Sequence, residues 1–596
     1  MKRLLLCALM LVVILLPTPS AGAEGGPKVL VTGSPIHGAN GIIFDADDRL
    51  HIASIFGREI VVMDPETGDI LDRLGPEVGV ESPDDLTFGP DGSLYWTAVL
   101  TGEVGRLSPD GTKTGQTVAL GVNPITFSDD GRLFVALDIL GDALYELDPD
   151  LIDPPRLIAE NLGSMNGMDW GPDGFLYGPL WTKGEVVRVD VDTGTVTLVA
   201  DGFRSPDAVK FDSQGRLYVA DYIVGEVSRV DVETGSKEVI ATGLSDIDNI
   251  AFDSHDRLFV SHAQEGSIFE VLPDGSTRTV SPGGMMWPGG VAVLPRADGE
   301  SVFVADTHTL REFDGLTGEG RSVERRYLLV PGDIDPQTVS ADGDHLVLSS
   351  WMSSAVQVWD PDTHEVLQHV EFPFPLNAIR FNGDLIVAGF TSVVRVSAAD
   401  PEARETLVDG LDMPTGLAAI DDDLWVSERG TGRALQIVAH GDRLSEPVPV
   451  ATGLSFPEGL ALTQGGSLLV VEASAGRLSL INTRTGEVST VAEGLELGAE
   501  GPPGMPPTWA FNGVAVGPSG AIYVTGDKAN VLYRIEAVEE APPIAPAPAA
   551  LPAAGSGGLL GEEGISLPTW WYALAAGGTL LIMGGLAGLA MAGRRR

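Results

Sequence analysis

Amide and carboxylate side chains recur at one fixed place in a repeated pattern of this 596-residue chain. They stand four residues before an aromatic or aliphatic residue that ends a short apolar stretch. In the first six copies every one is Asn or Asp: Asn40, Asp84, Asn123, Asn166, Asp207 and Asp248. In the second six copies the set is mixed: Gly289, Asp335, Asn377, Thr415, Glu458 and Asn512.

Two interpretations of these positions stay open. If the side chains converge, their carboxylates repel each other unless a cation joins them. Oxygen ligands without Cys or His favour a hard divalent cation, Ca²⁺ first and then Mg²⁺ or Mn²⁺. Alternatively, an Asn or Asp before a strand forms a turn with its own backbone. The turn interpretation suits the second, mixed set better than the first.

The elements that position these residues form a repeat of four short strands with Gly and Asp turns. The residue that ends the first strand recurs about every 43 residues. It is found at Phe44, Phe88, Phe127, Trp170, Phe211, Phe252, Val293, Val339, Phe381, Ala419, Leu462 and Val516. Four strands per repeat predict propeller blades, with a solenoid as the structural rival. We therefore expect an all-β fold of two six-bladed β-propellers in tandem, in which the amide and carboxylate positions line one mouth of each central channel.

The predicted domains are a first propeller over 24–284 and a second over 285–536. One detail leaves the closure of the rings open. Lys28-Val-Leu-Val-Thr-Gly33 looks like a fourth strand without a blade, and the twelfth unit ends at Glu536 without a fourth strand. The N-terminal strand could therefore close the last blade, which would place the twelfth unit in one ring with the first five.

The two ends of the chain look like targeting segments. Residues 1–23 have a basic start, an apolar run and an Ala21-Gly-Ala23 cleavage pattern, which predicts a signal peptide. A Pro/Ala-rich stalk over 537–568 leads to a predicted transmembrane helix over 569–593. The basic tail 594–596 predicts a single-pass cell-membrane protein with its N-terminus outside. Leu551-Pro-Ala-Ala-Gly555 leaves sortase-type wall anchoring as the alternative.

Composition excludes several classes of protein. The chain has 84 Asp and Glu against 37 Lys and Arg, a formal net charge of −47. A surface this acidic repels phosphate backbones, so we expect no nucleic-acid partner. The one cysteine, Cys7, lies in the predicted signal peptide. The exported protein therefore has neither an internal disulfide nor a cysteine-based zinc site.

Two strings in the first half carry a family resemblance: Ser164-Met-Asn-Gly-Met-Asp-Trp-Gly-Pro-Asp-Gly174 and Ser205-Pro-Asp-Ala-Val-Lys-Phe-Asp-Ser-Gln-Gly215. They resemble blades of the senescence marker protein/gluconolactonase group, which neighbours the NHL-repeat and strictosidine synthase-like propellers. The resemblance covers roughly 40–284. It implies a six-bladed, divalent-metal lactonase.

The resemblance also implies site residues. Asn123 and Asn166 correspond to the family's two metal-site Asn residues. Asp207 corresponds to its Asp, which is both metal ligand and general base. Asn40 stands where the family has a Glu, and this departure puts the metal site in doubt unless Asp84 or Asp248 compensates.

Two classes of function follow as expectations. The first is a metal-dependent hydrolase of small lactone-like molecules that acts through the first ring, with Asp207 as the catalytic residue. The second is a non-catalytic surface module that recognises a protein, peptide or glycan. In the second ring, Asp335, Asn377, Glu458 and Asn512 are the corresponding site candidates.

Overall fold

The computed structural model describes residues 26–244, 246–326, 334–502 and 510–538. Over these ranges the chain forms 48 β-strands and two short 3₁₀ helices, Pro76–Val78 and Ala473–Ala475. Among the described residues, no helix has the length and apolarity needed to cross a membrane. The predicted signal peptide, transmembrane helix and basic tail, and nearly all of the predicted stalk, lie outside these ranges.

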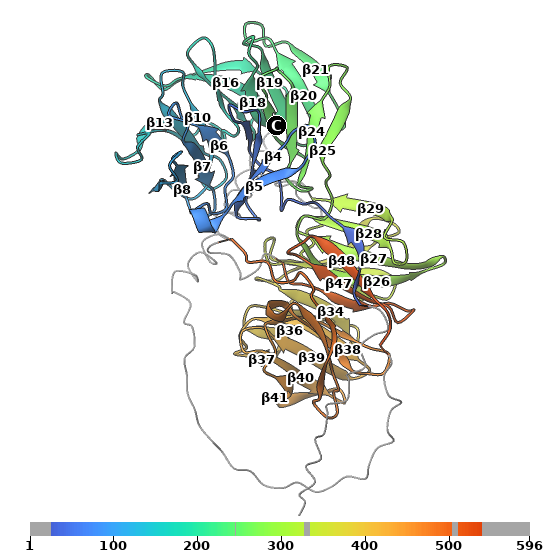
Figure 1. The fold of residues 1–596 in the computed structure, drawn as a ribbon. Helices are drawn as coiled ribbons and strands as arrows, with labels where there is room; N and C mark the ends of the chain where they lie inside the picture. Colours follow the sequence, from blue (N-terminus) through green and yellow to red (C-terminus); the bar gives the residue numbers. More distant parts are fainter. Residues whose placement is uncertain (1–25, 245, 327–333, 503–509, 539–596) are drawn as a thin grey trace, which may run out of the picture.

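The strands form twelve four-stranded antiparallel sheets, each with its strands in chain order except one (Figure 1). Six sheets make the first propeller: β2–β5 (42–74), β6–β9 (86–117), β10–β13 (122–160), β14–β17 (169–200), β18–β21 (206–241) and β22–β25 (247–281). Six make the second: β26–β29 (288–325), β30–β33 (338–371), β34–β37 (377–409), β38–β41 (414–452), β42–β45 (457–493) and β46–β48 with β1.

The innermost strand of each sheet is the first in chain order, except in the last blade, where β46 is innermost and β1 is outermost. In the first propeller these strands are β2 (Ile42–Phe44), β6 (Leu86–Phe88), β10 (Val122–Phe127), β14 (Asp169–Trp170), β18 (Pro206–Phe211) and β22 (Ile247–Phe252). Each contacts the next, and β2 also contacts β22, so the first six sheets close on themselves. In the second propeller the same cycle runs from β26 (Pro288–Arg296) to β46 (Val514–Val516), which contact each other.

The aromatic residues that mark the repeat in sequence hold neighbouring blades of the first propeller together. Each marker packs against a ring on the second strand of the adjacent blade, with centroids 4.9–5.6 Å apart. The pairs are His51–Phe88, Tyr95–Phe127, Phe134–Trp170, Tyr177–Phe211, Tyr218–Phe252 and Phe259–Phe44. The last pair joins the sixth blade to the first. Most are edge-to-face contacts, which contribute about 0.5–1.5 kcal/mol each beyond the area that they bury.

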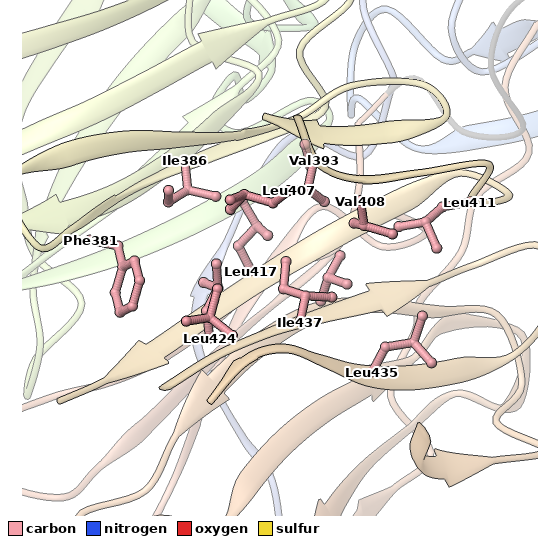
Figure 2. Close-up of a cluster of buried hydrophobic side chains, with 13 residues drawn as sticks. Phe381, Ile386, Val393, Leu407, Val408, Leu411, Leu417, Leu424, Leu435 and Ile437 are labelled. Carbon is pink, nitrogen blue, oxygen red and sulfur yellow. The ribbon is translucent and has the colours of Figure 1, made fainter. Parts of the chain in front are cut away.

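In the second propeller the marker residues are aliphatic except for Phe381. Figure 2 shows the cluster between the sheets β34–β37 and β38–β41, where Ile386, Leu417 and Ile437 are fully or almost fully buried. Phe381 is the one aromatic side chain in it. Alternate residues of each strand point into such clusters, as expected for sheets that pack face to face.

The N-terminal strand closes the last blade. β1 (Lys28–Thr32) pairs antiparallel with β48 (Val531–Ile535), with Lys28 opposite Arg534 and Thr32 opposite Val531. The closure considered from the sequence is therefore confirmed, but its consequence for the rings is wrong. The twelfth unit does not join the first five. Instead β1, which falls inside the predicted first domain, belongs to the second propeller.

Two connectors join the propellers and run side by side. One is residues 33–41, between β1 and β2, and the other is residues 282–287, between β25 (Thr277–Ser281) and β26. The Ser34 amide donates to the Met285 carbonyl at 2.8 Å. A Cβ on Gly33 would lie 2.2 Å from that carbonyl oxygen, so only glycine fits at this crossing.

Candidate functional site

The mouth of the first propeller is the end of the channel at which the innermost strands begin. All six predicted residues lie there, one from each blade, and all are buried or half-buried. Hydrogen bonds link five of them. Asn40 Nδ2 donates to Asp248 Oδ1 at 3.5 Å, Asn123 Nδ2 to Asn166 Oδ1 at 3.0 Å, and Asn166 Nδ2 to Asp207 Oδ1 at 2.8 Å.

Asp84 joins this group through its charge. Burial, followed by the Asp248 carboxylate and then by Asp138, raises its pKa well above the ordinary value. No hydrogen bond or ion pair to the Asp84 carboxylate is present in the described part of the chain. Asp207 behaves in the same way: burial and the Asp248 charge raise its pKa well above the ordinary range, against the hydrogen bond from Asn166.

Asp138 is a member of the mouth that the repeat pattern did not identify. It follows β11 (Leu133–Leu137), the second strand of its blade, and is buried. Its Oδ2 accepts from Asn123 Nδ2 at 2.9 Å, while its Oδ1 is buried without a partner. Burial raises its pKa to about 7. In the sequence, Asp138 is an acidic residue directly after the second strand of its blade. The repeat pattern marks only positions before the first strand, so it does not include Asp138.

Further oxygen atoms surround the ring. Asp246, two residues before Asp248, accepts from the Gln264 amide at 2.7 Å, and burial raises its pKa to about 8. Asp85 lies deeper, where its Oδ1 accepts from Asn249 Nδ2 at 3.3 Å and its Oδ2 from the Ile125 amide. Together with burial, the Asp85 and Asp138 charges raise the pKa of Asp248 to about 7.

The carboxylates of this mouth have no cationic partner. Asp84, Asp138, Asp207 and Asp248 form no ion pair with a lysine or arginine of the described ranges, and no basic group appears among the causes of their raised pKa values. Isolated buried carboxylates are costly, so such groups either stay protonated or share a cation. The mouth is therefore an acidic site whose charge nothing in this part of the chain compensates.

The donor set can be tested against a divalent cation. Among the described residues, no three His, Cys, Asp or Glu side chains stand close enough to form a metal cluster by themselves. The amides of Asn40, Asn123 and Asn166 stand between the carboxylates and complete an oxygen-only set. Two buried acceptors lack partners, Asn40 Oδ1 and Asp138 Oδ1. An oxygen-rich site with unsatisfied acceptors fits a hard cation in its chemistry.

The second mouth is built differently. Glu458 Oε1 pairs with Arg429 Nε at 3.0 Å, and its Oε2 accepts from the Asn512 amide at 2.7 Å. Asp335 pairs with Arg326, lies 3.6 Å from His308 Nδ1 and accepts from Ser350 Oγ at 2.8 Å.

The remaining second-mouth candidates have structural surroundings. Asn377 and Asn512 line a cavity of about 60 Å³ in the channel. Asn512 is further fixed by the Gly498 amide and the Thr525 carbonyl. The structure thus brings Glu458 and Asn512 into contact, and it pairs both Glu458 and Asp335 with an arginine.

A larger cavity of about 400 Å³ lies between the propellers. It is lined by Pro35, His37, Phe56, Gly57, Glu59, Arg73, Trp287, Glu500 and Lys528. Its two carboxylates are paired, Glu59 with Arg73 and Glu500 with Arg58. None of the residues predicted from the sequence lines this cavity.

Comparison with known proteins identifies part of the first propeller. Residues 128–264 match the family described as SMP-30/gluconolactonase/LRE-like region. The match includes Asp138, Asn166, Asp207 and Asp248. It leaves out Asn40, Asp84 and Asn123. No curated protein matches the chain significantly.

Several solved structures are similar to parts of the chain. Virginiamycin B lyase from Staphylococcus aureus is 16% identical over 46% of this chain and 94% of its own, with a TM-score of 0.35. A streptogramin B lyase is 17% identical over 47% and 93%, with a TM-score of 0.36. The extracellular domain of BT4673 from B. thetaiotaomicron is 11% identical over 87% and 84%, with a TM-score of 0.30. The sequence match thus identifies residues 128–264 of this chain as an SMP-30/gluconolactonase/LRE-like region.

Proposed function

We propose that the first propeller holds a divalent cation, Ca²⁺ first, at its mouth and hydrolyses small lactone-type esters there. The observation that carries this proposal is the contrast between the two mouths. Four carboxylates of the first mouth, Asp84, Asp138, Asp207 and Asp248, form no ion pair with a basic group of the described residues, whereas Glu458 and Asp335 of the second mouth each pair with an arginine. A bound cation would take the place that arginine fills in the second propeller.

Asn166 and Asp207 lie inside the family match and are the first proposed ligands. Asn123 lies just before it and is added because its side chain donates to Asn166. Asn40 offers a neutral oxygen where the family has a carboxylate. Asp84, Asp138 and Asp248 stand around it and would supply the missing negative charge. When bound, the cation would polarise the lactone carbonyl and stabilise the charge that develops on its oxygen.

Asp207 is the proposed general base. Burial and the Asp248 charge raise its pKa above the ordinary value, which makes its carboxylate a stronger base than an exposed one. The water oxygen bonds to the carbonyl carbon and its proton passes to Asp207. The ring C–O bond then breaks, and the proton is returned to the leaving alkoxide. The product is a hydroxycarboxylate.

Calorimetric titration of the purified protein with Ca²⁺ tests the cation site. We expect saturable binding that weakens in Asp207→Ala and in Asp138→Asn. Asp335→Asn is the matched control, because it alters a buried carboxylate of the second mouth that already has a basic partner. If the unaltered protein does not bind Ca²⁺, both the proposed cation site and the proposed lactonase activity are wrong.

Hydrolysis of a lactone panel in the presence of Ca²⁺ tests the reaction. General-base catalysis contributes about 10²–10⁴-fold, so Asp207→Ala is expected to lower kcat by that order. Full turnover by this variant would remove Asp207 as the base.

A second candidate function rests on the rim of the second mouth. Leu376, Met413 and Phe511 are buried there against Trp351 and Phe390, which are only partly buried. Phe456 is 46% exposed, with the Arg429 guanidinium 4.6 Å from its ring centre. Aromatic side chains around an opening suit recognition of a protein, peptide or glycan without catalysis. Ligand binding that persists in a chelator and is lost in Phe456→Ser would favour this function.

A further inference from the structure

Three large aliphatic side chains lie exposed on the rim of the first mouth. Leu120 is 40% exposed, Ile139 52% and Leu140 47%. Leu120 lies between β9 (Lys113–Thr117) and β10, and the other two lie between β11 and β12 (Ala143–Leu147). A Cβ on Gly121 would lie 3.0 Å from Leu140 Cβ, so these two loops touch. We call Leu120, Ile139 and Leu140 the rim strip.

The rim strip borders the ring of carboxylates directly. Loops that join the second strand to the third, or one blade to the next, lie at the end where the innermost strands begin. Asp138 immediately precedes Ile139, and its amide donates to the Gly121 carbonyl at 3.2 Å. Its side chain is bound to Asn123, inside the mouth. A single short loop thus carries a buried carboxylate with one unpartnered oxygen and then two exposed apolar side chains.

This arrangement has consequences for the substrate. The side chains of the rim strip have no hydrogen-bond donor or acceptor, so a polyhydroxylated ring that extended over them would lose water without gaining a partner. An aliphatic chain placed there would bury apolar surface on both sides. A polar head in the mouth and an aliphatic chain on the rim is the ligand that matches both surfaces.

The charge of the protein restricts the ligand further. At a formal net charge of −47, the molecule repels anions and does not repel a neutral ester. Hydrolysis converts a neutral lactone into a carboxylate, so the same field that admits the substrate favours departure of the product.

We propose that the substrate is a neutral lactone with an aliphatic chain, its ring in the first mouth and its chain along the rim strip. This inference rests on the proposed lactonase function and specifies its substrate class.

The test is a chain-length series at saturating Ca²⁺: γ-butyrolactone, γ-hexalactone, γ-octalactone and γ-decalactone, with glucono-δ-lactone as the polyhydroxylated comparison. Each methylene buried should raise kcat/KM about fourfold, the equivalent of about 0.8 kcal/mol, until the chain outgrows the strip. In the double variant Ile139→Ser/Leu140→Ser this slope should fall markedly. Ile152→Ser is the matched control, since Ile152 is 77% exposed on the loop between β12 and β13, at the opposite end of the blade.

The outcomes separate this inference from the function on which it rests. If glucono-δ-lactone is hydrolysed and the γ-lactones show no chain-length trend, the proposed role of the rim strip is wrong and the proposed lactonase function is retained. If no lactone is hydrolysed, the proposed function fails. Calorimetric binding of the corresponding γ-lactams then tests whether the rim strip binds an aliphatic chain. Lactam binding that strengthens with chain length in the unaltered protein, but not in the double variant, supports the rim strip. Absent or chain-independent binding overturns it.

Discussion

Glu458 and Asp335 show how the surroundings of a buried carboxylate in this protein set its pKa. The Glu458 side chain is fully buried, and burial raises its pKa to about 7 although Arg429 and the Asn512 amide favour the charged form. Asp335 is comparably buried, yet His308, Arg326 and Ser350 hold its pKa below the ordinary value. Whether a buried carboxylate of this protein stays ionised thus depends on how many basic and hydrogen-bonding groups oppose burial, and Asp335 has more of them than Glu458, whose pKa the Asp527 charge also raises.

Removing the partner of Glu458 tests this account. Arg429→Met leaves a buried carboxylate without its cation, which is expected to lower the free energy of unfolding by about 3–5 kcal/mol. Adding Glu458→Gln removes the stranded charge and should restore most of the loss. Urea denaturation of both variants and of Glu458→Gln alone, followed by tryptophan fluorescence, measures the coupling. Equal stability of the single Arg429 variant and the double variant would contradict the prediction.

The candidate site could be predicted from the sequence only in part. The six positions before the innermost strands repeat with the blades, so their convergence at one mouth follows from the spacing. Asp138 and Asp246 do not repeat in this way, because each owes its place to one loop. The pairing of Glu458 with Arg429 was also hidden, since these residues come from the starts and ends of strands in neighbouring blades.

Among the elements, β1 is unusual because it completes a blade far from it in the sequence. It supplies the outer strand of a blade whose other three strands lie about 500 residues further along the chain. Deleting residues 26–32 exposes the edge of β48 and removes its hydrogen bonds to β1. Hydrogen exchange should then rise in β46–β48 and spread through the second propeller, while β22–β25 of the first propeller stays protected.

A substitution on the same strand provides the control. Val29 is largely exposed and its backbone remains paired with Tyr533, so Val29→Thr should leave exchange in β48 unchanged. Protection of β48 that survived the deletion would show that the blade is stable with three strands.

The repeat in the sequence predicted the blades because each one is local, four strands within about 40 residues. The markers of the first propeller were also the clearest, since Phe44, Phe127 and Phe211 each contact a ring in the preceding blade of the propeller. The partner of β1 could not be assigned in the same way. Every blade has a similar outer edge, and a five-residue strand carries no local signal that distinguishes one edge from another.

At the scale of the whole molecule, the two propellers meet through loops on the mouth side of each. Asn530 Nδ2 donates to the Ser34 carbonyl at 2.9 Å, and Gln264 Nε2 to the Arg326 carbonyl at 2.8 Å. The His37 ring contacts the Asp527 carbonyl at 2.7 Å and the edge of Trp287. These polar contacts and the paired connectors fix one propeller against the other.

The two propellers should respond differently to pH when divalent cations are chelated. The pKa values of Asp138 and Asp248 are raised to about 7 and that of Asp246 to about 8, above the value of about 3.9 in an unfolded chain. A raised carboxyl pKa stabilises the fold at low pH, and this stability is lost as pH rises through the folded value. The first propeller should therefore lose stability between pH 4 and pH 8.

Differential scanning calorimetry from pH 5 to pH 8 measures this effect. In the second propeller Glu458 and Asp527 have raised pKa values, fewer carboxyls than in the first, so its transition should move less. Asp335, with its lowered pKa, stays ionised throughout this range and adds no pH dependence. Asp138→Asn should reduce the pH-dependent shift of one thermal transition, which identifies that transition as the unfolding of the first propeller. Added Ca²⁺ should raise the midpoint most at pH 8, and a first transition that did not depend on pH would contradict the account.

The pairing of β1 with β48 also affects how the two propellers, together called the head, withstand mechanical load. Tension that enters the head from the residues after Glu536 acts along β48, which lies between β47 (Ile522–Gly526) and β1. The backbone hydrogen bonds on both sides of β48 lie across this direction. They are loaded together in shear instead of being opened one at a time from an end. The strand that closes the second ring is thus also the one that reinforces the point where the chain leaves the head.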